Sequence, residues 1–175
     1  MPLNLALAQI NTKLGDVDAN LEKHLSLIKD AHKNGSDLVL FPELSLTGYT
    51  LQDLVPSVAL SPHQDARVFH HLKQASRDID IVVGFINADS RHRFFISAAY
   101  LSKGEIVHIH NKVYLPTYGI FDEKRFIAPG DRFRPFQTRW GCAGILICED
   151  FWHASSPYLL WQGGADILLM TSASP

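Results

Sequence analysis

Cysteine is scarce in this sequence, with two among 175 residues, and no apolar run is long enough to span a bilayer. Two cysteines cannot build the dense disulfide framework of a small secreted domain, and the N-terminus does not resemble a secretion signal. We therefore expect the protein to reside in a reducing cytoplasm. Neither sign of charge predominates, because 16 basic and 18 acidic residues leave a net charge of only −2. That balance gives no electrostatic footprint for nucleic acid or an anionic membrane surface.

Internal repeats, low-complexity tracts and linkers are also absent, and the length suits one domain. Apolar stretches alternate with amphipathic ones, and 46% of the residues are hydrophobic, which is enough for a core. Helices are expected over residues 18–34, 63–77 and 156–163. Strands are expected over residues 3–11, 37–42, 79–87, 94–101, 105–111, 133–139, 143–148 and 166–171. This order predicts an α/β fold, a mixed sheet with helices on its faces.

Capping and turn residues set several of these boundaries. Asp18 is a candidate N-cap of the first helix, and Gly35 a candidate residue just beyond its end. Residues 43–62 are expected to form a loop because they contain Gly48, Pro56 and Pro62. The segment 102–104 is expected to turn a hairpin.

The run 144–152 ends an apolar stretch at Cys148 and continues with two carboxylates and two aromatics. A thiol at the end of a buried strand is well placed to attack a substrate, and amides at a following helix N-terminus favour the reactive thiolate. The alternative is a buried structural cysteine. Cys142 is interpreted as such a core residue. It would share a strand face with Cys148 but lie too far away for a disulfide.

Two further ionisable residues follow expected strands. Glu43 comes after an apolar stretch and Pro42, and a carboxylate at the edge of a core has a raised pKa and can shuttle protons. The alternative is a glutamate that merely caps or pairs at a strand end. Lys112 follows the strand 105–111 and can stabilise the negative charge of a tetrahedral intermediate. The alternative is a solvated surface lysine.

Taken together, the three segments place a base, a cation and a thiol at the C-terminal ends of expected strands. In open α/β sheets, sites assemble at that edge. These groups are the ones needed for acyl transfer through a thioester. The combination therefore predicts an enzyme that cleaves an acyl bond.

These segments resemble the motifs of the nitrilase superfamily of carbon–nitrogen hydrolases. The resemblance is carried by Phe41-Pro42-Glu43, by Lys112 with Leu115-Pro116, and by Cys148-Glu149-Asp150, in the family's order. It implies Glu43 as general base, Lys112 as oxyanion stabiliser and Cys148 as nucleophile. It further implies Glu123 as a second catalytic glutamate, and the backbone N–H of Glu149 as an oxyanion donor.

Within the superfamily, the sequence is most similar to the glutaminase domain of glutamine-dependent NAD synthetase and its stand-alone amidase relatives. Residues 41–49, 115–125 and 148–152 carry this likeness. The resemblance implies an αββα sandwich. Domains of this family are longer than this chain, so residues 1–175 are expected to form the N-terminal part of a carbon–nitrogen hydrolase domain whose C-terminal portion is absent.

The resemblance implies hydrolysis of a small amide, glutamine among them, with no metal or organic cofactor. Family members commonly pair, so it also implies a homo-oligomer. A different class of function is a non-catalytic or incompletely folded fragment, or a dimerisation module of such an enzyme. A nitrilase acting on C≡N bonds uses the same three residues, but Cys148-Glu149-Asp150 resembles amidase-type members more closely.

Other residues are interpreted more simply. The aromatics Tyr49, Tyr118 and Trp152 are candidates for the substrate pocket, with plain packing as the alternative. A zinc site on His108 and His110 lacks a third ligand at suitable spacing, which favours a strand-face or supporting role. The pair His70-His71 is expected on a helix surface. A solvated loop face, or contact with an anionic substrate, is expected of Lys124, Arg125, Arg132 and Arg134.

Overall fold

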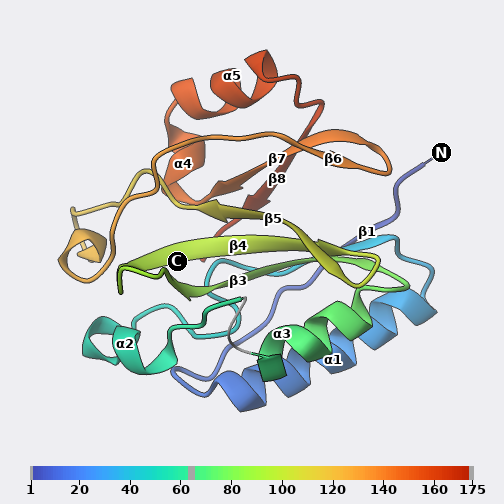
Figure 1. Ribbon diagram of the computed structural model, residues 1–175, viewed down its shortest axis with the longest axis horizontal. Coiled ribbons are helices and arrows are strands. Elements are labelled where there is room, and N and C mark those ends of the chain that lie inside the picture. Colours follow the sequence, from blue (N-terminus) through green and yellow to red (C-terminus); the bar gives the residue numbers. More distant parts are fainter. Residues whose placement is uncertain (1, 63–65, 174–175) are drawn as a thin grey trace.

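Two β-sheets pack face to face in the computed structural model, which describes residues 2–62 and 66–173 (Figure 1). The first sheet has the order β1-β2-β3-β4-β5, formed by Leu5–Leu7, Leu38–Leu40, Asp80–Ala88, Phe94–Ser102 and Glu105–Asn111. The second has the order β6-β7-β8, formed by Phe136–Thr138, Gly141–Ile147 and Ile167–Thr171. Strands β1, β2 and β3 run parallel, and β4 and β5 continue the sheet in antiparallel fashion. In the second sheet, β7 pairs antiparallel with β6 and parallel with β8.

Helices cover the outer faces of both sheets. The first sheet is covered by α1 (Val17–Lys33) and α3 (Ala66–Ala75), and the second by α5 (Ser155–Gln162) (Figure 1). Shorter helical turns are η1 (Gln52–Leu54), α2 (Val55–Val58), η2 (Glu123–Arg125) and α4 (Glu149–Trp152). None of the helices within the described ranges combines the length and the apolar character that crossing a bilayer requires. The layers confirm the αββα sandwich.

The alternation of side chains along the strands divides the core into layers. On β3, Val82 and Ile86 point between the sheets and meet Ile145 and Ile147 of β7. The residues between them, among which are Ile81, Val83 and Phe85, pack against α1 and α3. A smaller cluster of Leu146, Leu160 and Ala165 joins the second sheet to α5.

The first helix begins at Val17, one residue earlier than the sequence predicts, and its N-cap lies two residues earlier. Its N-cap is Asp16, whose Oδ1 accepts the N–H of Ala19 at 3.0 Å, whereas Asp18 lies inside the first turn. The reason is Gly15, which has φ +71° and turns the chain into the helix at that point. Gly35 follows the C-cap residue with φ +78°, as expected.

Two further segments can be compared with the turn and the loop expected from the sequence. The hairpin between β4 and β5 turns at Lys103 and Gly104, both with positive φ, as the tight turn predicted there requires. The loop expected over 43–62 is partly wrong, because η1 and α2 lie within it. Pro56 does not break the chain there but lies in the first turn of α2, a position that suits proline because its missing N–H has no helical partner. The expected start of the next helix, His63, lies outside the described residues.

Candidate active site

A buried lysine joins two glutamates where the first sheet ends. Glu43 follows β2 and Lys112 follows β5, and these strands run in the same direction, so their C-terminal ends share one edge. Lys112 Nζ donates to Glu43 Oε1 at 2.7 Å and to Glu123 Oε1 at 2.9 Å. All three side chains are buried. Lys112 is therefore not the solvated surface lysine considered as its alternative.

Each of these charged groups shifts the pKa of its neighbours. Burial raises the pKa of Glu43, the charge of Glu123 adds to the rise, and Lys112 opposes it. Burial by itself would lower the pKa of Lys112, but the two carboxylates outweigh that effect, so its pKa is raised. The lysine consequently keeps its charge at neutral pH, and Glu43 holds a proton more readily than an exposed glutamate.

The turn that carries Glu43 lies directly on strand β3. Leu46 N donates to Gly84 O at 2.9 Å, and a Cβ on Gly84 would lie 2.4 Å from Leu44 N and 2.6 Å from Pro42 O. From the other side, buried His24 of α1 contacts Ser45 Oγ at 3.0 Å. Only glycine at position 84 permits this close approach.

Substituting Gly84 with alanine is expected to displace the Glu43 turn. Because the added Cβ meets backbone rather than a flexible side chain, we expect the free energy of unfolding to fall by at least about 2 kcal/mol. A shifted Glu43 should lower kcat roughly 100-fold. Thermal unfolding and amide turnover measure the two effects.

Gly144→Ala is the matched control for that substitution. Its Cβ would lie 2.7 Å from Leu160 side-chain atoms, on the outer face of the second sheet. It should cost about 1–3 kcal/mol of stability while kcat of the folded protein stays unchanged. Equal losses of kcat in both variants would contradict the special role of Gly84.

Glu123 bonds to Lys112 and also lines a cavity. Its Oε1 also accepts the hydroxyl of Tyr49 at 2.6 Å, while its buried Oε2 has no hydrogen-bond partner among the described residues. Burial and the bond to Glu123 raise the pKa of Tyr49, so its hydroxyl remains a donor. Glu123 and Tyr49 line a cavity of about 810 Å³, together with Phe121, Arg125 and Ala173. Ala173 N also donates to Glu43 Oε2 at 3.2 Å, so a lining residue contacts the general-base candidate, which does not itself line the cavity.

Cys148 occupies a strained turn between β7 and α4. Its φ of 45° and ψ of −101° fall in a region that non-glycine residues rarely adopt, and such strain costs about 1–3 kcal/mol. The turn is held by Cys148 N, which donates to Thr171 O at 2.8 Å, and by Phe151 N, which donates to Cys148 O at 3.0 Å. A strained strand-to-helix turn is the arrangement that projects a nucleophile at the top of a sheet.

The end of β8 ties the thiol turn to the glutamate: Thr171 O accepts the N–H of Cys148, and Ala173, two residues later, donates its N–H to Glu43 Oε2. The pKa of Tyr118 is raised chiefly by its bond to Glu149 and further by the charge of Cys148, with Lys112 acting in the opposite direction. Cys148 also adds to the rise at Tyr49. The structure thus brings Glu43, Lys112, Cys148 and Glu123 to one place.

The two cysteines do not share a face, contrary to the sequence-based expectation. The positive φ of Cys148 breaks the alternation of β7, and its side chain packs with the residues between the sheets. Cys142 is half-buried, not a core residue, because it lies on the short β6–β7 ladder opposite Gln137. Neither cysteine forms a disulfide within the described residues.

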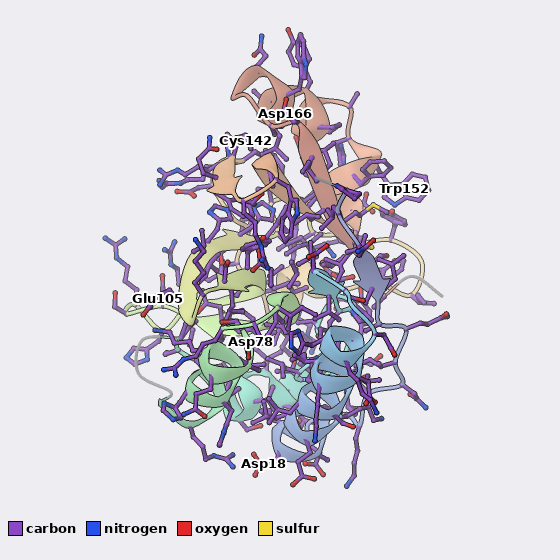
Figure 2. All side chains as sticks on the ribbon, turned by 90° about the vertical axis from the view of Figure 1, so that its right-hand side faces the viewer. Asp18, Asp78, Glu105, Cys142, Trp152 and Asp166 are labelled. Carbon is purple, nitrogen blue, oxygen red and sulfur yellow. The ribbon has the colours of Figure 1, made fainter. Side chains whose placement is uncertain are left out.

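The expected substrate-binding residues separate into two groups. Tyr49 lines the cavity. Tyr118 is 59% exposed and donates to Glu149 Oε2 at 2.8 Å, so these two form a pair that does not line the cavity. Trp152 is 75% exposed and points outward from the upper layer (Figure 2). The structure therefore does not bring Trp152 into the cavity.

Asp150 is the residue whose importance the sequence did not reveal. It is fully buried, and its carboxylate accepts the N–H groups of Val113, Tyr114 and Ile147 and contacts His110 Nε2. Two signals were available: an acidic residue two positions after the nucleophile candidate, and a histidine two positions before the lysine on its strand.

The remaining histidines and basic loop residues stack on aromatic rings or lie exposed. Within residues 2–62 and 66–173, no group of three His, Cys, Asp or Glu side chains is suited to a metal ion. His108 stacks on Phe136, and burial, with smaller effects of His110 and Arg134, lowers its pKa to about 4. His70 and His71 are exposed, as are the four basic residues Lys124, Arg125, Arg132 and Arg134. Of these four, Arg125 lines the cavity described above.

Comparison with known proteins agrees with the geometry. The family model described as carbon-nitrogen hydrolase matches residues 4–175. Glutamine-dependent NAD(+) synthetase of Acinetobacter baylyi is 34% identical over 98% of this chain and 31% of its own length. The enzyme of the same name from Thermotoga maritima is 34% identical over 99% of this chain and 30% of its own length. The chain thus spans less than a third of these relatives.

Solved structures show the same fold. The glutamine-dependent NAD+ synthetase of Acinetobacter baumannii superimposes with a TM-score of 0.89 at 34% identity, over 98% of this chain and 32% of that one. An amidase of the nitrilase superfamily from Nesterenkonia gives a TM-score of 0.84 at 23% identity, over 97% of this chain and 64% of that one.

Proposed function

Because the chain belongs to the carbon-nitrogen hydrolase family, we propose that it hydrolyses the C–N bond of a small primary amide through a thioester on Cys148. One observation supports this more than any other: a fully buried Lys112 is bonded to two buried carboxylates, and one of these, Glu43, accepts the N–H of Ala173, two residues after the Thr171 that holds the strained turn of Cys148. Similarity to glutamine-dependent NAD synthetases makes glutamine the first substrate to consider.

The first half of the proposed reaction forms the thioester. Glu43 accepts the thiol proton while the sulfur of Cys148 attacks the carbonyl carbon, and the carbonyl electron pair moves onto oxygen. An ammonium group has three N–H donors, and Glu43 and Glu123 take two of those on Lys112, which leaves the third for the oxyanion. The backbone N–H of Glu149 is the second donor. Glu43 then protonates the leaving nitrogen, the C–N bond breaks, and ammonia departs.

The second half releases the acid. Glu43 takes a proton from water as the water oxygen adds to the thioester carbonyl. The C–S bond then breaks, the electron pair returns to sulfur, and the carboxylic acid leaves. Glu43 returns its proton to the thiolate. The raised pKa of Glu43 suits a group that both accepts and donates protons.

Glu123 and Tyr49 complete the proposed site. Tyr49 and Lys112 both bond to Oε1 of Glu123, which fixes that carboxylate, while Oε2 is left with an unfilled acceptor position. A substrate amide N–H is the donor that we assign to it. A nitrile has no such N–H, so this acceptor favours an amide.

The setting of the proposed enzyme follows from its chemistry. A thiol nucleophile needs a reducing environment, which agrees with the cytoplasm predicted from the sequence. A homo-oligomer remains a prediction. Because the chain spans less than a third of the curated synthetases, the proposal covers amide hydrolysis and not NAD synthesis.

Ammonia release from L-glutamine and other primary amides, measured across pH, tests the proposal. The reaction needs Glu43 unprotonated and Lys112 charged. The pKa of Glu43 is raised above the ordinary 4.5 and that of Lys112 above 10.5. We therefore expect the acid limb of kcat/KM above pH 4.5 and loss of activity through Lys112 only above pH 10.5.

Two controls accompany that assay. Hydroxylamine should divert the thioester to a hydroxamate, which separates acyl transfer from direct attack by water. No ammonia from any amide, together with ordinary reactivity of Cys148, would favour the non-catalytic module instead.

A further inference from the structure

We propose that Asp150, held by His110, is the positioning residue that sets the distance between Cys148 and Lys112. This inference rests on the proposed function, in which Cys148 attacks and Lys112 holds the oxyanion. The two residues come from different sheets, β7 and β5, which share no β-ladder among the described residues. Side-chain contacts must therefore keep them in register.

The hydrogen bonds of Asp150 reach both catalytic segments. Oδ1 accepts the N–H of Val113 at 3.0 Å and of Tyr114 at 2.9 Å, the two residues after Lys112. Oδ2 accepts the N–H of Ile147 at 3.2 Å, the residue before Cys148. One carboxylate thus joins the end of the lysine strand to the strained turn of the nucleophile.

His110 makes the fourth polar contact with the Asp150 carboxylate. Its Nε2 lies 2.9 Å from Asp150 Oδ2, and the ring is buried and stacked on Phe133 at 5.5 Å between centroids. His110 and Lys112 are two residues apart, so they project from the same face of the chain. The histidine fixes the rotation of the carboxylate, which in turn fixes both backbones.

Only a carboxylate satisfies all four contacts. Oxygen atoms can accept from the three N–H groups and from the imidazole, because an ionised carboxylate offers acceptors on both atoms. An asparagine turned with its oxygen toward Val113 and Tyr114 would present its NH₂ to the N–H of Ile147. Two facing donors repel, so the turn before Cys148 should move.

Alkylation by iodoacetamide tests the positioning without requiring a known substrate. The labelling rates of Cys148 and Cys142 are followed by peptide mass mapping in the wild type, Asp150→Asn, His110→Leu and His110→Gln. We expect Asp150→Asn and His110→Leu to slow Cys148 roughly 10- to 100-fold and leave Cys142 unchanged. His110→Gln should remain within about threefold of the wild type, because its amide nitrogen can replace Nε2 as donor.

Asp80→Asn is the matched control. Asp80 is also a fully buried carboxylate with several partners, among them Ser102 Oγ at 2.7 Å and Arg139 at 2.9 Å, but it begins β3 at the opposite edge of the sheet. The Asp80→Asn substitution should lower the melting temperature without slowing the alkylation of Cys148 in the folded protein. If Asp150→Asn does not fold, the two His110 variants decide the question.

The outcomes distinguish failure of the positioning role of Asp150 from failure of Cys148 as the proposed nucleophile. Unchanged or faster labelling of Cys148 in Asp150→Asn would overturn the positioning role, since faster labelling is what loss of a negative charge alone predicts. Slowing that Asp80→Asn reproduces at the same folded fraction would overturn it too. If the wild type labels Cys148 no faster than Cys142, the proposed nucleophile itself is wrong and the inference falls with it.

Discussion

Cys148→Ala is expected to lower kcat for amide hydrolysis by at least about 10⁴-fold, because the proposed thioester cannot form without the sulfur. The fold should change little. Alanine retains the Cβ and the backbone bonds of Cys148 to Thr171 and Phe151, and the loss of one buried sulfur costs on the order of 1 kcal/mol. Ammonia release and thermal unfolding measure the two effects.

Cys142→Ala is the appropriate control for that experiment. Cys142 is the other cysteine, on β7 and outside the site, whereas Cys148 lies in the turn after that strand. Its removal should leave kcat within about twofold of the wild type, as expected for a substitution away from any named feature. Comparable activity losses in the two variants, or full activity in Cys148→Ala, would show that the thioester mechanism is wrong.

Lys112→Met is expected to have the largest combined effect. It leaves Glu43 and Glu123 buried without their cation, and breaking a buried ion pair in this way costs about 3–5 kcal/mol. Activity should disappear as well, because the oxyanion loses its charged donor, a loss of about 100- to 1000-fold in kcat for one such donor. Denaturant unfolding and turnover give both numbers.

The pH dependence of that stability loss identifies its cause. Glu43 has a raised pKa in the folded state, so its contribution is favourable below its unfolded value of 4.5 and is lost as pH rises through the folded value. Lys112→Met should therefore be most destabilised near neutral pH and recover as pH falls toward 4. Adding Glu43→Gln and Glu123→Gln should restore stability without activity. A pH-independent loss would instead indicate a packing defect.

The strand ends were predictable because local chemistry determines them. Pro42 cannot continue a ladder, so Glu43 was placed just beyond a strand, and positive φ at Gly104 completes the hairpin that brings Lys112 to the same edge. The order of Glu43, Lys112 and Cys148 along expected strands was therefore enough to predict that they converge.

The contacts between the sheets were not predictable in this way. Asp150 is one of two adjacent acids after Cys148, and the sequence does not distinguish the buried one from Glu149, which pairs with exposed Tyr118. Trp152 was expected in the pocket because aromatics near strand ends line cavities as well as surfaces. The direction in which it points depends on the α4 turn, which only the folded chain reveals.

The hydrogen bond between Ala173 N and Glu43 Oε2 has a consequence for synthesis on the ribosome. It joins residues 130 positions apart, and Thr171 likewise holds the backbone of Cys148. A nascent chain therefore carries its thiol before the strand that fixes it has been made. We therefore expect the reactivity proposed for Cys148 to appear only once β8 has paired with β7, after the segment that holds its backbone has been synthesised.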